Sequence, residues 1–272
     1  MIALREVCQS FTAVVLTGGS SGIGKSFIEL AGNLYPALRF CNLSRTAPVI
    51  KSEELILCHV PCDLASVVET ERAATEVEAF LNRDVPAGRV LLINNSGFGS
   101  YGAFPEPNLS QQLEMLQVNT VAMVRLTGRL LPVLKARGGV VMNIASTAAF
   151  QPTPHLAVYG ATKSFVLNWT LALNEEWRGT NLRAMAVCPG PTSTPFFQRA
   201  GLAPGNAAER TGMSTEAVVL AALRGLAKGK SLVVPGWKNK LLAAASGMGP
   251  RTWVARISGQ VIAAQRLQHV RA

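Results

Sequence analysis

The sequence predicts an α/β protein: a doubly wound parallel sheet of about seven strands with helices on both of its faces. Three observations lead to this fold class. Short apolar runs alternate with helical patterns along the chain. The hydrophobic content is 49% and the charged content only 15%, which suits a parallel sheet that is buried on both sides. A length of 272 residues is sufficient for one large domain with a well-buried core.

The predicted strands are the apolar runs, which are rich in Val, Leu and Ile. They cover residues 13–17, 38–43, 55–60, 90–94, 139–144, 182–187 and 231–235. Helical patterns lie between them, and one of these begins at Tyr159 (YGATKSFVLNWTLALNEEW). We therefore expect one domain over residues 1–235 and a C-terminal extension over residues 236–272.

The first run ends in a glycine-rich turn that a helical pattern follows, and this order is typical of a dinucleotide phosphate site. Gly18 makes the tight turn, Gly22 lets the backbone approach a diphosphate, and Gly24 lets the helix pack closely. The helix N-terminus offers N–H groups to the anion. The alternative is an ordinary glycine-rich β-turn. The expected phosphate-binding residues are Thr17, Gly18, Ser20, Ser21, Gly22, Ile23 and Gly24.

Tyr159 and Lys163 are four residues apart in the predicted helix, so their side chains share one face. A free tyrosine has a pKa of about 10, too high for proton transfer near neutrality. A cation beside it favours the phenolate, and the pKa of Tyr159 is therefore expected to fall. A surface lysine beside a packed tyrosine is the alternative, because this spacing also occurs by chance.

Together these residues resemble the short-chain dehydrogenase/reductase family, in its single-domain, non-extended branch. The glycine turn matches TGxxxGxG, and further motifs match as Asn94-Asn95-Ser96-Gly97, QVNTV, NIAST and Pro189-Gly190. They occur in the family's order over residues 12–235. Ser96 replaces the family's usual alanine, a departure that we expect to be tolerated.

The resemblance implies a Rossmann-like fold and hydride transfer between a nicotinamide and a carbonyl or secondary alcohol carbon. It makes Tyr159 the general acid/base, Lys163 its partner and a ribose ligand, and Ser146 a donor to the substrate oxygen. Asn119 would hold a proton-relay water; a buried hydrogen bond to the backbone is the alternative. Further cofactor contacts are implied at Asp63, Leu64, Asn95, Gly97, Tyr159, Lys163, Pro189, Gly190, Thr192 and Thr194.

The cofactor preference is predicted from the end of the second strand. An NAD site has an acidic residue about 20 residues past the glycine turn. This sequence has Ser44 and Arg45 there instead, which suit a 2′-phosphate, so we expect NADP(H) rather than NAD(H). The alternative for Arg45 is the start of a solvated loop, and the alternative for Asp63 is the N-cap of a helix that begins near Ala65.

The substrate is expected to be an apolar small molecule. Residues 192–212 lie where the family keeps its substrate lid, and Phe196 and Phe197 would close over the ligand. The opposite side would be lined by Phe98, Tyr101, Phe150 and Pro154, with core packing as the alternative for each aromatic. His155 would share the helix face of Tyr159 if the helix extends that far, although a packing or capping role is the commoner one.

Other signals point to a cytoplasmic enzyme. The five cysteines show no CxxC pair and no zinc spacing, which favours buried thiols in a reducing compartment and no metal. Neither a signal peptide nor a membrane-spanning run is evident. The family resemblance implies a homodimer or homotetramer. A non-catalytic NADP-binding scaffold is the alternative function, but it would be expected to lack Tyr159, Lys163 or Ser146.

The charge is unevenly distributed, because the chain has nine Lys and Arg but no Asp or Glu after Glu216. Residues 236–272 are basic and amphipathic, with Trp237 and Trp253. This segment could lie on an anionic membrane, cover a neighbouring subunit's active site, or pack on its own domain, which we expect. Nucleic-acid binding is not expected, since no recognition motif accompanies the charge.

Overall fold

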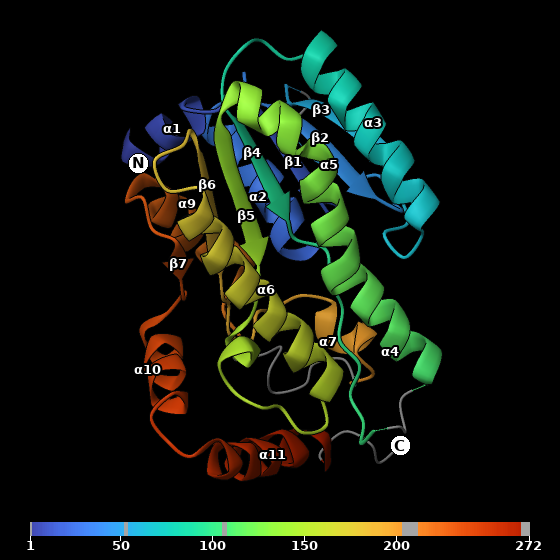
Figure 1. Ribbon diagram of the computed structural model, residues 1–272, viewed down its shortest axis with the longest axis vertical. Coiled ribbons are helices and arrows are strands. Elements are labelled where there is room, and N and C mark those ends of the chain that lie inside the picture. The colour runs from blue at the N-terminus through green and yellow to red at the C-terminus, as the bar shows by residue number, and fades with distance from the viewer. Residues whose placement is uncertain (1, 52–53, 105–107, 203–211, 268–272) are drawn as a thin grey trace.

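The sheet has seven parallel strands in the order β3-β2-β1-β4-β5-β6-β7, which confirms the predicted fold class (Figure 1). The computed structural model describes residues 2–51, 54–104, 108–202 and 212–267. Every predicted apolar run forms a strand. The strands are β1 (Ala13–Thr17), β2 (Arg39–Ser44), β3 (Ile56–Pro61), β4 (Val90–Asn94), β5 (Gly139–Ile144), β6 (Leu182–Val187) and β7 (Leu232–Val233).

Helices cover both faces of the sheet, and alternate residues of each strand contact the two layers. In β1, Val14 and Leu16 pack in the layer that holds α1 (Ile2–Gln9), α2 (Gly22–Leu34) and α9 (Thr215–Ala227). Ala13 and Val15 pack in the opposite layer, with α3 (Val67–Arg83), α5 (Ala122–Arg137) and α6 (Ala157–Glu176). A central strand such as β1 is buried along its whole length because helices cover both faces of the sheet there.

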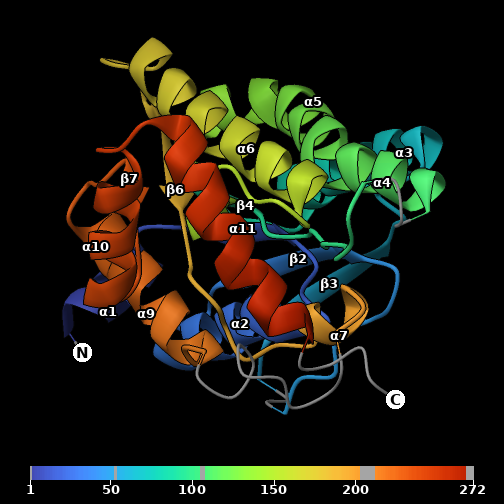
Figure 2. The same cartoon turned by 90° about the horizontal axis from the view of Figure 1, so that it is seen from below.

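The strand order reverses between β1 and β4, which both leave the sheet at its carboxyl edge. The strand arrows in Figure 1 point to this edge, where α7 (Phe196–Arg199) and α11 (Arg251–Leu267) lie. Also placed near this edge are α4 (Leu109–Leu116), the π-helical turn η1 (Gln117–Val121), the short helix η2 (Thr147–Phe150) and α10 (Trp237–Ser246). Figure 2 shows the molecule from below, where α11 lies in front of the sheet and runs from the side of α10 toward α7.

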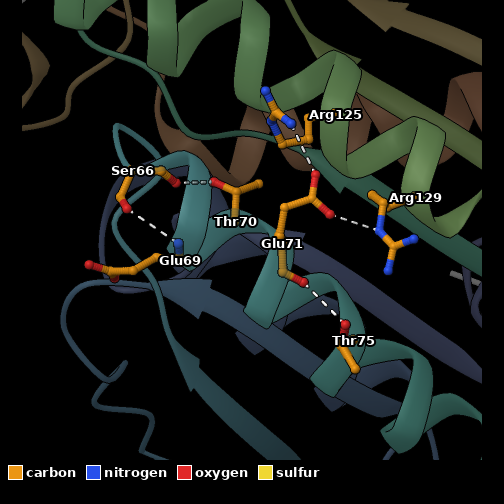
Figure 3. A network of polar contacts seen from close by, with 7 residues as sticks. All are labelled: Ser66, Glu69, Thr70, Glu71, Thr75, Arg125 and Arg129. Atoms are coloured by element: carbon orange, nitrogen blue, oxygen red, sulfur yellow. Dashed lines mark hydrogen bonds and ion pairs between the residues drawn. The ribbon is translucent and has the colours of Figure 1, made fainter.

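Charged side chains join the two helices that flank the reversal (Figure 3). Glu71 of α3 bridges Arg125 at 3.0 Å and Arg129 at 2.9 Å, both on α5. These side chains are partly exposed, so each ion pair contributes only about 0–1 kcal/mol. Their effect is to hold the start of α5 in place, directly after η1.

Two predicted helix boundaries differ in the structure. The helix after β3 begins at Val67, not near Ala65, because Ser66 is its N-cap and accepts a hydrogen bond from Glu69 N at 3.2 Å. Asp63 is therefore not the cap. His155 lies outside α6 in a left-handed conformation with φ of 65°, so it does not share a helix face with Tyr159.

Candidate active site

The glycine-rich turn is held against the end of the neighbouring strand β4 by partly buried hydrogen bonds. Thr17 Oγ1 accepts from Asn95 N at 3.0 Å and from Ser96 N at 2.9 Å, while Asn95 Nδ2 donates to Thr17 O at 2.9 Å. Gly18 has φ of +73°, and a methyl group on Gly24 would lie 2.4 Å from the Gly18 oxygen. The turn thus requires glycine at both positions, one for its backbone angle and one for close packing.

A buried asparagine, Asn42, holds the other side of the turn, and no role was predicted for it from the sequence. Asn42 Oδ1 accepts from Gly19 N at 2.7 Å, and its Nδ2 donates to Ser44 Oγ at 2.7 Å. A fully buried amide in an apolar strand needs such partners. That contrast between residue type and strand is the signal that could have identified Asn42.

The proposed catalytic side chains meet at the carboxyl ends of β4 and β5. Tyr159 and Lys163 lie one turn apart on α6, and the Lys163 Nζ is 5.8 Å from the centre of the Tyr159 ring. Lys163 Nζ donates to Ile144 O at 2.8 Å. Ser146 Oγ accepts from Ala148 N at 3.1 Å, which leaves its own proton to donate.

Burial is the largest influence on the pKa values of Tyr159 and Lys163. It raises the pKa of Tyr159 to about 12, against a smaller lowering by a hydrogen bond with Ser146. Burial lowers the pKa of Lys163 to about 8. The expected lowering of the Tyr159 pKa by Lys163 is therefore not seen, because desolvation outweighs other effects and the ammonium is held by a backbone carbonyl.

Asn119 lies in the π-helical turn η1, between α4 and α5. Its Nδ2 donates to Phe98 O at 2.9 Å and to Thr162 Oγ1 at 3.1 Å, and its Oδ1 accepts from Phe98 N at 3.1 Å. These bonds are of the kind that the alternative interpretation, a structural hydrogen bond to the backbone, anticipates. They tie the segment after β4 to α6, and π-turns are frequent at functional sites.

One cavity of about 600 Å³ joins the glycine turn to Tyr159, Ser146 and Lys163. Thr17, Gly24 and Asn119 do not line it; they lie behind its wall. Three residues predicted near the substrate do not line it either: Phe150, Pro154 and His155. Phe150 packs instead in the layer around Val166. The predicted cofactor residues on its wall are Gly18, Ser20, Ser21, Gly22, Ile23, Ser44, Arg45, Asp63, Leu64, Asn95, Gly97, Tyr159, Lys163, Pro189, Gly190, Thr192 and Thr194.

The substrate end of the cavity is aromatic and apolar. The Phe196 ring lies 5.2 Å from the Tyr159 ring, centre to centre, and Phe98, Tyr101 and Phe197 also line the wall. Of the predicted lid, residues 203–211 lie outside the described part of the chain. Among the lining residues that were not predicted from the sequence are Gln111, Glu114, Leu242 and Ile262.

The residues present fit a dinucleotide. Ser21 is the N-cap of α2 and lines the cavity, and its side chain accepts no capping bond from the described residues, so this helix N-terminus is available to an anion. Arg45 is exposed and lines the same cavity. The Ser44 hydroxyl already donates to Thr46 O at 2.7 Å, so Arg45 is the better placed donor for a 2′-phosphate. Asp63 Oδ1 accepts from Ala65 N at 3.0 Å.

Some kinds of site are absent from the residues that the structure describes. No group of three or more His, Cys, Asp or Glu is arranged there to hold a metal ion. Within the same ranges, no helix has both the length and the apolarity needed to span a bilayer.

Fold and site together define an oxidoreductase with a nicotinamide cofactor. A family model described as short chain dehydrogenase matches residues 12–204. The chain therefore belongs to the short-chain dehydrogenase family. It is 28% identical to the ketoacyl reductase HetN of Nostoc over 250 residues, which are 88% of this chain and 79% of HetN.

Solved structures agree with this assignment. A short-chain dehydrogenase from Sphingobium yanoikuyae in complex with NADPH is 26% identical, with a TM-score of 0.70 over 87% of this chain and 94% of that one. A short-chain dehydrogenase/reductase from Burkholderia phymatum in complex with NAD shares the fold, at 18% identity and a TM-score of 0.72, over 86% of this chain and 92% of that one. The two structures hold different nicotinamide cofactors.

Proposed function

We propose that the protein is an NADP(H)-dependent dehydrogenase/reductase that interconverts a carbonyl and a secondary alcohol on an apolar substrate. The observation that carries this proposal is the shared cavity, which joins an uncapped helix N-terminus to Tyr159, Ser146 and Lys163. The nicotinamide, when bound, supplies or accepts the hydride. All other steps fall to side chains of this chain.

Tyr159 is the proton donor in reduction. With a pKa of about 12 its hydroxyl stays protonated at neutral pH, so it can give a proton to the developing alkoxide. Ser146 adds a second hydrogen bond at the same oxygen, where negative charge collects. Lys163 is close enough to stabilise the phenolate that Tyr159 leaves behind, and it is also placed to contact the cofactor ribose.

The preference for NADP(H) rests on Arg45. Its guanidinium can make charge-assisted hydrogen bonds to a 2′-phosphate, and neither Ser44 nor Arg45 supplies the carboxylate that a ribose 2′-hydroxyl would favour.

Gly97 leaves room beside the reacting groups, because a methyl there would lie 3.0 Å from Asn119 Oδ1 and 3.2 Å from Lys163 Nζ. We assign Asn119 to this region as a holder of the relay water.

The apolar character of the substrate rests on the wall around Tyr159. Met115 and Leu156 are buried against it, and Phe98, Tyr101 and Phe196 pack around them. The likeness to ketoacyl reductases makes 3-oxoacyl thioesters the first substrate class to try.

The alternative function, a non-catalytic NADP-binding scaffold, is not favoured, because the cavity contains Ser146, Tyr159 and Lys163 together.

The direct test is consumption of NADPH and NADH with a panel of ketones, aldehydes, steroids and 3-oxoacyl thioesters. We expect turnover with NADPH on an apolar carbonyl compound. Turnover with NADH alone would remove the cofactor assignment, and no turnover together with tight NADPH binding would favour the scaffold.

We also propose a homodimer or homotetramer in the cytoplasm. Leu113, Val124 and Phe165 expose apolar surface on α4, α5 and α6, a region available for contact between copies. The five cysteines are all unpaired thiols, as a reducing compartment would keep them. Light scattering of the purified chain measures the oligomeric state directly.

A further inference from the structure

The two C-terminal helices have one face on the domain and one face in solvent. Ser258 Oγ of α11 donates to Pro152 O at 2.7 Å, and Asn239 Nδ2 of α10 donates to Pro235 O at 2.8 Å. Leu242 and Ile262 line the cavity that contains Tyr159. The inner face of α10 and α11 is therefore part of the wall at the substrate end.

The outer face is apolar to an unusual degree. Trp237 is 71% exposed, Met248 87% and Trp253 68%. Met248 lies in the turn between the two helices, and four more large apolar side chains on the helices themselves are exposed: Leu241, Leu242, Ile257 and Val261. We name these seven residues the C-terminal apolar patch. A group of large exposed apolar side chains on neighbouring elements marks a surface that meets another apolar phase.

The two helices that carry the patch have basic and no acidic residues. Lys238, Lys240, Arg251 and Arg256 are exposed on the same two helices, and no Asp or Glu follows Glu216. In the described part of the chain, no ion pair involves any of these four bases. Lys238 Nζ lies 5.7 Å from the centre of the Trp237 ring, so base and aromatic ring are adjacent. Basic residues beside exposed tryptophan are the pattern of a lipid-surface element.

We propose that α10 and α11 dock the enzyme on an anionic lipid bilayer, with the C-terminal apolar patch in the headgroup boundary. Charge complementarity selects this occupant: a second copy bound through the same patch would place four bases against four bases. Leu242 is 51% exposed and also lines the cavity, so the cavity opens beside the patch. Docking would place that opening at the lipid surface, where an apolar substrate concentrates.

The test uses the full chain and no substrate, so it is independent of the proposed reaction. We expect co-sedimentation with vesicles of phosphatidylcholine mixed with phosphatidylglycerol at low salt. Binding should fall at high salt, because salt screens the bases, and should be weak on phosphatidylcholine alone. The tryptophan fluorescence of the wild-type chain should shift to the blue on the mixed vesicles, a readout that needs no variant.

Two pairs of matched variants sharpen the test. Trp237→Ser with Trp253→Ser should weaken vesicle binding at least about tenfold, whereas Ile2→Ser with Val68→Ser, exposed apolar residues elsewhere, should not. Neutralising Lys238, Lys240, Arg251 and Arg256 to glutamine should also weaken it by about tenfold or more. Neutralising the exposed Arg5, Lys51, Lys135 and Lys228 should change it much less.

Three results would overturn the proposal. One is equal binding to neutral and mixed vesicles, or binding to neither. The second is salt-insensitive binding that the control variants reduce as much as the patch variants do. The third is a change of oligomeric state in the Trp237→Ser, Trp253→Ser variant without vesicle binding by the wild type, which would assign the patch to a contact between copies.

Discussion

The two ends of the cavity are built in different ways. The cofactor end consists of strand ends and the glycine turn, held by hydrogen bonds such as those from Gly19 N to Asn42 Oδ1 and from Asn95 Nδ2 to Thr17 O. The substrate end consists of the short helix α7 and one face of α10 and α11, whose other face is exposed. The cofactor end is therefore the rigid part of the site, and the substrate end is the part that side-chain changes can adapt.

The largest expected effect comes from the group between the two ends. Tyr159→Phe removes the proton donor but keeps the ring that packs on Phe196, so turnover should fall by about 10²–10⁴-fold. NADPH affinity should stay within about twofold, because the ring and the glycine turn remain. Steady-state kinetics with fluorescence titration measure both, and Tyr35→Phe, far from the cavity, is the matched control. Wild-type turnover in Tyr159→Phe would refute the assigned role.

The next effect separates the cofactor end from the rest. Wild-type NADPH should bind about tenfold to a hundredfold more tightly than NADH, through charge-assisted bonds from Arg45. Arg45→Ala should remove most of this preference and Ser44→Ala little, because the Ser44 proton is donated to Thr46 O. Ser44→Asp with Arg45→Ala should reverse it.

Fluorescence titration of both cofactors measures this preference. Arg5→Ala, at an exposed arginine outside the cavity, is the control. Equal wild-type affinities for NADPH and NADH would remove the argument.

A pH effect follows from burial of Lys163. Its pKa of about 8 means that it is charged below that pH and neutral above it. Since Lys163 must be charged to stabilise the phenolate, kcat/KM for reduction should be level at lower pH and fall above about pH 8. Lys163→Arg should move the fall to higher pH in whatever activity it retains, whereas Lys135→Arg should not. A profile with the same fall in both variants would assign the titration to another group.

The smallest expected effect belongs to the substrate end. Leu242→Ala or Ile262→Ala removes apolar contact from the wall, which should cost about 1 kcal/mol, or roughly fivefold in KM for an apolar substrate. NADPH affinity should not change, because the two ends are held independently. Ile257→Ala, at an exposed position of α11, is the control. A loss of NADPH affinity in Leu242→Ala would contradict the division of the cavity into two ends.

The same division separates what the sequence could predict from what it could not. The strands and the glycine turn are local features: apolar runs of the right length and glycines at a required spacing occur within a few residues. The turn residues predicted from those features line the cofactor end of the cavity, apart from Thr17 and Gly24, whereas the contacts at Asp63 and Pro189 were implied by the family resemblance.

The remainder depends on packing between distant segments. The pKa of Tyr159 rises because the whole cavity wall desolvates it, which no spacing of four residues reveals. The part played by Leu242 and Ile262 depends on where α10 and α11 fold back, and the amphipathic pattern alone allowed several placements. Asn42 required knowing that its strand lies beside the glycine turn.

The most direct test of the two-ended cavity is a crystal structure of the protein with NADPH bound. The account predicts the diphosphate on the turn at residues 18–24, the 2′-phosphate at Arg45, and the nicotinamide beside Tyr159 and Lys163, with the space toward Phe196, Leu242 and Ile262 left for substrate. A nicotinamide bound away from Tyr159, or a nucleotide in the space between Phe196 and α11, would contradict it.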